Sequence, residues 1–61
     1  METFQFIAEF DGDTTTITIA VNADGRSMAD AQDDAQALAE EEAAAHFDCD
    51  TDDEDLMVTE S

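Results

Sequence analysis

Acidic side chains outnumber basic ones so heavily in this chain that any fold must form against its own charge. The 61 residues include 18 Asp and Glu but only one basic residue, Arg26, which gives a formal net charge of −17. Repulsion on this scale opposes compaction, and it restricts the surface to contacts with water, cations or a basic partner. The chain therefore depends on whatever apolar core its short length allows.

The length allows a single small domain, which we place at 1–61. A domain of this size buries only about 60% of the surface that its unfolded chain exposes. Its large apolar side chains are few, so the core supplies only about 3–5 kcal/mol unless a metal, salt or a second subunit adds to it. A homodimer is therefore an open alternative.

The first residues, Met1-Glu2-Thr3-Phe4, lack the basic region and the long apolar run of a secretory signal. No segment approaches the roughly 20 apolar residues that cross a membrane as a helix. Cys49 is the only cysteine and cannot form an intrachain disulfide, which agrees with a reducing compartment. We expect a soluble cytoplasmic protein, located inside the host cell if it is phage-encoded.

Two segments of alternating apolar residues predict a β-hairpin. The apolar positions are Phe4, Phe6, Ala8 and Phe10 in the first segment and Ile17, Ile19 and Val21 in the second. Asp11-Gly12 favours a tight turn between them, because a type I′ turn needs positive φ at both central residues. A two-residue loop pairs Phe6 with Ile17 and a four-residue loop pairs Phe6 with Ile19, and both bring the same faces together.

A helix is predicted from near Met28 to about Ala45 or His46. Ser27 followed by Asp30 resembles a capping box, and the segment is rich in Ala and Glu without Gly or Pro. At about 100° per residue, one side of the helix is expected to pack on the hairpin. The expected packing residues are Met28, Ala31, Ala35, Leu38, Ala39 and Ala45. Glu42 interrupts this side near its end, which would let the last turn lift away.

The segment 48–55 holds six carboxylates in eight residues and is expected to be a solvated loop. Residues 56–59 follow it and predict a short third strand, whereas the alternative is a frayed, disordered tail. The predicted fold class is α+β with a ββαβ order, in which an antiparallel hairpin at 3–21 gains a short third strand and is covered on one face by helix 28–46. The other sheet face, where Ile7 lies among polar residues, is a candidate contact surface.

The acidic helix residues could imitate the phosphates of nucleic acid. They span roughly 16 Å at about 1.5 Å per residue, and duplex DNA presents one phosphate per about 1.7 Å of its axis. A solvated face is the simpler interpretation, but such faces normally include Lys and Arg. The candidate partner-binding residues are Asp30, Asp33, Asp34, Glu40, Glu41, Asp48, Asp50, Asp52, Asp53, Glu54 and Asp55.

Two functions fit this charge. The first is a non-enzymatic inhibitor or binding protein whose acidic surface mimics nucleic acid and blocks a basic, nucleic-acid-binding partner. The alternative is a small haloadapted cytoplasmic protein, or an adaptor or oligomerisation module, whose acidity serves solubility in molar salt. Repulsion is largely screened there, because the Debye length is about 3 Å at 1 M. The two functions can coexist in one protein.

In size, acidity and hairpin-plus-helix pattern, the chain resembles the small phage-type inhibitors that act as DNA mimics, including anti-CRISPR proteins. The resemblance covers the character of the whole chain and no shared motif, so it assigns no function to any single residue. It implies a target with a Lys/Arg-lined nucleic-acid channel in a host defence complex, such as a CRISPR effector.

Metal and cofactor sites are not predicted. Asp48, Asp50 and Asp52 match the opening of an EF-hand calcium loop, but Asp53 replaces the glycine of the turn and Thr59 replaces the bidentate Glu. Loose binding of Mg²⁺, Ca²⁺ or K⁺ is the expected behaviour. His46 and Cys49 offer only two of the four ligands that a structural zinc site needs, so a zinc site would require carboxylates and a dimer.

Catalysis and direct nucleic-acid binding are not expected either. Acid–base chemistry by paired carboxylates needs an apolar pocket that excludes water, for which this chain has little room. Cys49 lies among aspartates that oppose thiolate formation, which argues against a nucleophile. Phosphate contacts need Lys and Arg, and Arg26 is the only one present.

Overall fold

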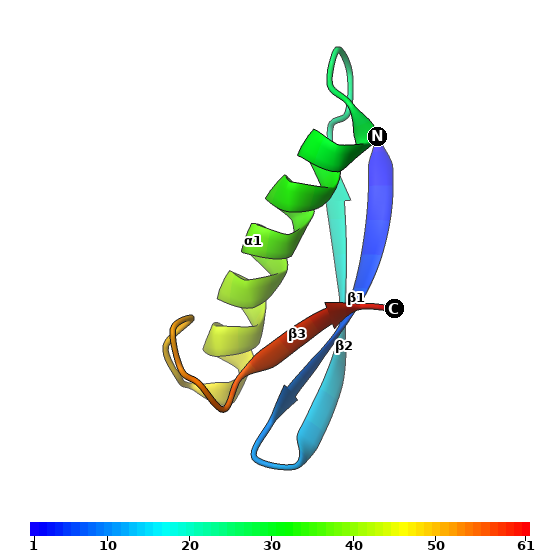
Figure 1. Ribbon diagram of the computed structural model, residues 1–61. Coiled ribbons are helices and arrows are strands. Elements are labelled where there is room, and N and C mark those ends of the chain that lie inside the picture. The colour runs from blue at the N-terminus through cyan, green and yellow to red at the C-terminus, as the bar shows by residue number, and fades with distance from the viewer.

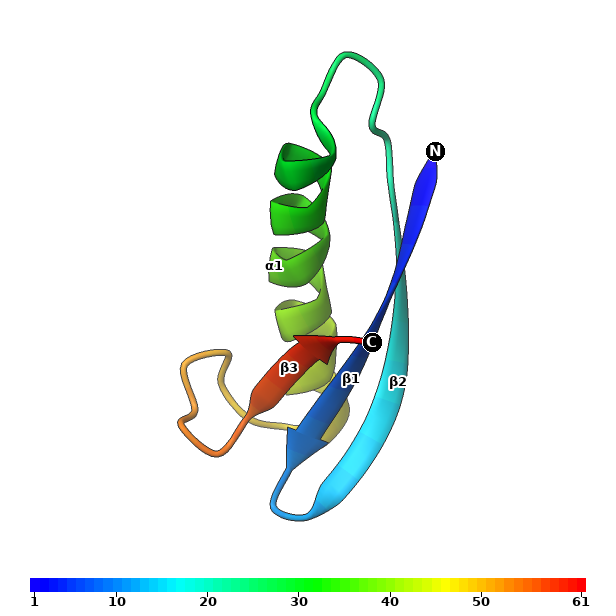
Figure 2. The ribbon, with the colours of Figure 1, turned by 45° about the vertical axis from the view of Figure 1, so that its right-hand side comes forward.

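The computed structural model describes residues 1–61 and contains three strands and one helix (Figure 1). The elements are β1 (Glu2–Phe10), β2 (Asp13–Val21), α1 (Met28–Phe47) and β3 (Met57–Glu60). The strands form one antiparallel sheet in the order β2-β1-β3. α1 lies on one side of this twisted sheet and leaves the other side open (Figure 2). The predicted α+β class and ββαβ order are confirmed.

The turn between β1 and β2 has the conformation that Asp11-Gly12 predicts. The φ angles of Asp11 and Gly12 are 52° and 87°, both positive as a type I′ turn requires. The turn pairs Phe10 with Asp13 and Phe6 with Ile17. Of the two loop lengths considered, the two-residue loop is therefore the one that forms.

Every second residue is buried beneath α1 from Phe4 to Ala8 and from Ile17 to Val21. Phe6 and Ala8 have no exposed surface, and Phe6 is the only large side chain that is fully buried. Phe4, Ile17, Ile19 and Val21 are also buried. These are the positions that the alternation in the sequence predicts, except that Phe10 is only half-buried.

Both ends of α1 have hydrogen-bonded caps. Ser27 Oγ accepts a hydrogen bond from the Asp30 amide at 3.2 Å, which is one of the two bonds of the predicted capping box; the return bond from the Ser27 amide to the Asp30 carboxylate is absent. At the other end, Asp48 adopts a left-handed conformation (φ 56°, ψ 49°), and the Cys49 amide donates to the Ala44 carbonyl at 2.9 Å. The helix thus ends at Phe47, one residue beyond the predicted end.

α1 packs on the sheet through alanines spaced four residues apart. Ala31, Ala35, Ala39 and Ala43 are completely buried, and Phe47 continues the row. Rows of i, i+4 positions are inclined by about 26° to the helix axis, so the contact moves around the helix along its length.

The predicted packing side of α1 is therefore wrong at three of its residues. That prediction assumed a contact parallel to the helix axis, which would have buried Met28, Leu38 and Ala45. All three are exposed, because the inclined alanine row turns away from the side on which they lie.

The last turn of α1 stays on the sheet instead of lifting away. Ala43 and Ala44 are buried, and the Phe47 ring lies 5.6 Å from the Phe10 ring between centroids. Glu42 is exposed beside the alanine row and does not interrupt it. An aromatic pair thus fastens the end of the helix to the end of β1.

β3 forms, in place of the alternative disordered tail. It pairs with residues 6–9 of β1, and the Ser61 amide extends the pairing by donating to the Gln5 carbonyl at 3.0 Å. The strand begins one residue later than predicted, and Leu56 and Val58 pack partly buried against the core.

The core is thin because alanine supplies much of it. Eleven residues are buried, and six of them are alanine. Small side chains let the helix approach the sheet closely, but each removes little apolar area from water. The result is an elongated molecule of 37 × 18 × 15 Å with little stability to spare.

This close packing can be tested by enlarging one alanine. We expect Ala35→Leu to destabilise the fold by about 1–3 kcal/mol, because a fully buried contact has no room for three more carbon atoms. Ala37→Leu is the matched control on the exposed side of the same helix and should change stability by less than about 0.5 kcal/mol. Chemical denaturation followed by circular dichroism measures both. Equal effects of the two substitutions would contradict the alanine contact.

Candidate protein-binding surfaces

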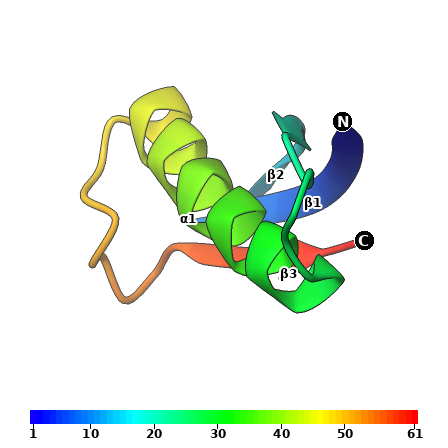
Figure 3. The same ribbon diagram turned by 90° about the horizontal axis from the view of Figure 1, so that it is seen from above.

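The acidic residues are concentrated on the helix side of the molecule. α1 carries six of the 18 carboxylates, and the loop 48–55 carries six more. The loop lies beside the C-terminal end of α1, and Figure 3 shows it projecting beyond the sheet. No charged residue is buried. Two thirds of the acidic charge therefore belongs to one helix and the loop that follows it.

The predicted helix carboxylates share the exposed half of α1 but not a single row. Asp33 and Glu41 lie opposite the alanine row and point into solvent. Asp30 and Asp34 occupy the flank that faces β2. Glu40 is partly buried on the other flank. It lies in the same row as Gln32, whose side-chain amide donates to the Glu60 carboxylate of β3. The structure thus spreads these five carboxylates around the helix.

Arg26 is fully engaged within the molecule. Its guanidinium forms an ion pair with Asp34 at 2.8 Å and donates to the Asp30 carbonyl at 3.1 Å and to the Asn22 carbonyl at 3.4 Å. These contacts join the β2–α1 connection to the first turns of the helix. The one basic side chain therefore stabilises the fold and offsets a single carboxylate, Asp34.

The acidic loop has hydrogen-bonded turns despite its charge. The Asp53 amide donates to the Asp50 carbonyl at 3.1 Å, and the Leu56 amide donates to the Asp53 carbonyl at 3.0 Å. The Asp53 carboxylate also accepts from the Asp55 amide at 3.0 Å. These bonds give the predicted loop residues, Asp48, Asp50, Asp52, Asp53, Glu54 and Asp55, a defined arrangement.

The position of this loop opposes the stability of the helix. The C-terminal end of a helix carries a partial negative charge, and anions placed there are unfavourable by about 0.3–1 kcal/mol each when exposed. Asp48 and the loop carboxylates follow that end of α1, and Glu40, Glu41 and Glu42 lie within about two turns of it. This end is the most negative part of the molecule, and Arg26 lies at the opposite end of the helix.

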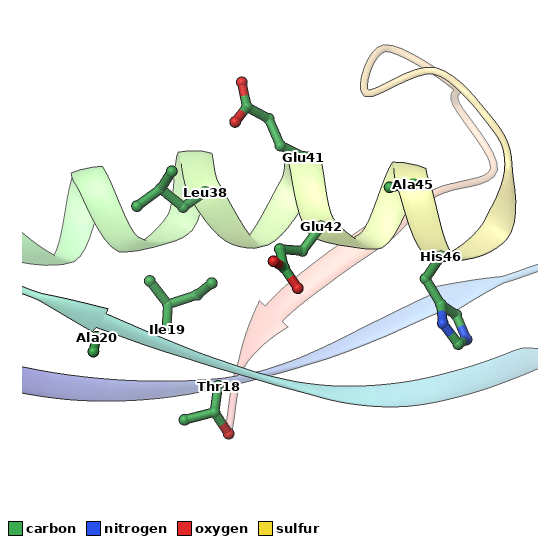
Figure 4. Close-up of a pocket in the computed structure, with 8 residues that line it drawn as sticks. All are labelled: Thr18, Ile19, Ala20, Leu38, Glu41, Glu42, Ala45 and His46. Atoms are coloured by element: carbon green, nitrogen blue, oxygen red, sulfur yellow. The ribbon is translucent and has the colours of Figure 1, made fainter.

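A groove runs between α1 and β2 (Figure 4). It has a volume of about 730 Å³ and is lined by Thr18, Ile19, Ala20, Leu38, Glu41, Glu42, Ala45 and His46. Figure 4 shows Leu38 and Ile19 approaching each other from the helix and the strand, and Glu42 pointing down toward β2. Leu38 remains 44% exposed. The groove therefore combines an apolar centre with carboxylates along its helix wall.

The open face of the sheet is almost free of charge. It is formed by the side chains that alternate with the buried ones, and Ile7 and Met57 are 44% and 58% exposed there. Glu9 pairs with Met57 and is the one carboxylate on this face. The two broad sides of the molecule thus differ in character: one is anionic and the other is neutral.

His46 and Cys49 are not joined by further metal ligands, because no group of three or more His, Cys, Asp and Glu side chains is arranged to hold a metal ion. His46 instead lies edge-on to Phe47, with ring centroids 4.8 Å apart. Its ring thereby belongs to the aromatic contact at the end of α1 and to the wall of the groove.

Comparison with known proteins finds no matching family model, no matching curated protein and no matching solved structure. The one helix of this protein is not long and apolar enough to span a membrane. Any function must therefore be inferred from the surfaces described above.

The groove was not predicted from the sequence. Leu38 was assigned to the buried side of the helix, and Ile19 was treated only as a core residue. One signal was nevertheless present, because residues 14–21 contain no charged side chain although 18 acids occur elsewhere. An uncharged segment in a chain of this charge lets another molecule approach without repulsion from neighbouring carboxylates.

The surroundings of Cys49 predict that its thiol reacts slowly with alkylating reagents. Partial burial, followed by the carboxylates of Asp53, Asp50 and Asp48, raises the pKa of the Cys49 thiol above its usual 9.0. The thiolate fraction at pH 8 is therefore lower than that of an unperturbed cysteine, and alkylation by iodoacetamide should be slower. Asp53→Asn should accelerate alkylation, whereas Asp33→Asn, on the helix and away from the thiol, should not. Equal rates in both variants would contradict this interpretation.

Proposed function

We propose that this protein is a non-enzymatic binding protein whose carboxylate-rich helix side occupies the basic surface of a nucleic-acid-binding partner. The partner is a protein or complex that holds DNA or RNA in a Lys/Arg-lined groove. In this position the carboxylates replace phosphates and block access of nucleic acid. The resemblance to small DNA-mimic inhibitors supports this partner class, of which a CRISPR effector is one example.

The observation that carries the proposal is the uneven placement of charge. Twelve of 18 carboxylates belong to α1 and the loop 48–55, and the one arginine offsets only one of them, Asp34. Acids chosen only for solubility have no reason to avoid one face of the sheet or to gather at the negative end of a helix. A cationic partner offsets that unfavourable placement and accelerates association through long-range attraction.

The first test is capture from a nucleic-acid-binding fraction of the host, followed by competition with a short DNA duplex. Saturating duplex should displace the captured basic partner, because both occupy the same cationic surface. Capture should fall at least about tenfold at low salt in a five-site variant that carries Asn or Gln in place of Asp30, Asp33, Asp34, Glu40 and Glu41.

The control removes the same number of charges from other parts of the molecule. Glu2, Glu9, Asp11, Asp13 and Asp24 lie outside α1 and the loop, and their amide variants should capture the partner nearly as well as the parent. Equal losses in both five-site variants would show that only net charge matters. Capture that resists DNA would exclude mimicry.

The thin alanine core favours a second candidate function, a small haloadapted protein whose acidity maintains solubility in concentrated salt. Molar salt screens repulsion between exposed carboxylates, and it strengthens burial of a core with few large side chains. In this case the acids serve hydration, and the partner, if any, binds elsewhere.

A folding titration in KCl separates the two candidates. We expect circular dichroism to show the native helix already at about 0.1 M salt, where the Debye length is about 10 Å. The thermal midpoint should still rise with KCl, because screening relieves repulsion among the loop carboxylates. A chain that is unfolded at 0.1 M and folds only in molar KCl would favour salt adaptation over mimicry.

A further inference from the structure

β2 is an edge strand with one side unpaired. The sheet order β2-β1-β3 leaves β2 with β1 as its only neighbour along all nine residues. Its nine consecutive pairs with β1 contain no bulge, and it has no proline. A regular strand of this length presents a row of backbone donors and acceptors to another strand.

The pairing pattern identifies the backbone groups that face outward. The Gln5 carbonyl accepts from Ser61 on the β3 side, so the odd-numbered residues of β1 direct their backbone toward β3. Backbone direction alternates along an antiparallel strand, so the even-numbered residues of β1 bond to β2. Phe4 pairs with Ile19 and Phe6 with Ile17. The backbone groups of Thr16, Thr18 and Ala20 therefore point to the free edge.

This edge lacks the features that normally prevent strand addition. Natural edge strands are protected by charged side chains, prolines, bulges or a covering segment. Residues 14–21 carry no charge in a chain with 18 acids, and the groove lies directly beside Thr18, Ile19 and Ala20. The edge is thus exposed at the point where α1 leaves room for an additional strand.

The residues on the helix wall of the groove indicate which side chains an added strand could place there. Leu38 and Ile19 provide an apolar contact. Glu42, one turn further along α1, points its carboxylate toward β2, while Glu41 lies at the outer rim and points away from the strands. A Lys or Arg side chain fits both features, because its aliphatic stem can cover Leu38 while its charged end reaches a carboxylate.

We propose that an extended, basic segment of the partner adds to β2 as a fourth strand and places its Lys or Arg side chains in the groove. Backbone hydrogen bonds to Thr16, Thr18 and Ala20 would supply affinity, and the Glu42 carboxylate in the groove, with Glu41 at its rim, would select a basic sequence. The choice of occupant rests on the proposed function, since the segment belongs to the same cationic partner.

Charge argues against a second copy as the occupant. If β2 paired with β2 of a second copy, the α1 helices of both copies would lie beside the shared interface. Each helix has Glu41 and Glu42 on its groove wall. The net charge of each copy is −17, and the one arginine is already paired with Asp34. Nothing in the second copy could neutralise the groove carboxylates.

The test uses a fluorescent ten-residue peptide of alternating Val and Lys, and a second peptide of the same sequence with every backbone nitrogen methylated. Both carry the same charge, but only the first can donate backbone hydrogen bonds. Fluorescence anisotropy should show binding of the first peptide and at least about tenfold weaker binding of the second. In the unchanged protein, the amides of Thr16, Thr18 and Ala20 should become protected from hydrogen exchange when the first peptide binds.

Matched substitutions locate the binding site. Thr18→Pro removes an outward donor without removing a bond to β1 and should weaken binding about tenfold, whereas Thr18→Val should not. The double variant Glu41→Gln and Glu42→Gln should weaken binding about fivefold. Its control, Glu54→Gln with Asp55→Asn, removes the same charge from the loop and should have less than a twofold effect. Circular dichroism verifies that each variant keeps the native helix.

Two results would overturn strand addition. One is equal binding of the methylated peptide with no added amide protection in β2, which indicates adhesion to the anionic surface only. The other is a dimer of the free protein in sedimentation that Thr18→Pro abolishes, which assigns the edge to a second copy. Neither result affects capture by the helix carboxylates, so failure of strand addition is distinguishable from failure of the proposed function.

Discussion

The fold depends on close contact between a row of alanines and the buried face of a hairpin. Ala31, Ala35, Ala39 and Ala43 bring α1 against Phe4, Phe6 and the β2 isoleucines, and Phe47 fastens its last turn to Phe10. This contact must overcome the repulsion of a chain with a net charge of −17. It can do so with few large side chains because the helix and sheet approach closely along their whole shared length.

The same contact limits where the charge of the helix can lie. Alanines at every fourth position occupy one row, which leaves the other three rows of α1 for polar residues or for the groove. The acids of α1 lie on these three rows, and the open sheet face keeps only Glu9. The position of the groove follows from this inclined contact, whereas the acids of the loop and the neutral sheet face do not.

Much of the fold could be predicted from local sequence signals. Alternation defined the buried hairpin residues, Asp11-Gly12 defined the turn, and Ser27 defined the start of α1. The errors at Met28, Leu38 and Ala45 arose because a helical period gives the spacing of a contact but not its inclination, which depends on the twist of the sheet. The groove depends on that inclination, so it could not be predicted from the sequence. The acidic residues themselves were evident, whereas their division among three rows required the structure.

The order of strands also constrains how the chain folds. β1 precedes both of its neighbours in the sequence yet becomes the central strand, and β3 joins it only when Thr59 pairs with Ile7. Before that pairing, one edge of β1 is bare and open to strands of other chains. The six-acid segment lies immediately before β3, and its charge opposes the approach of a second, equally acidic chain. The strand that closes the sheet last is thus preceded by charges that disfavour self-association during folding.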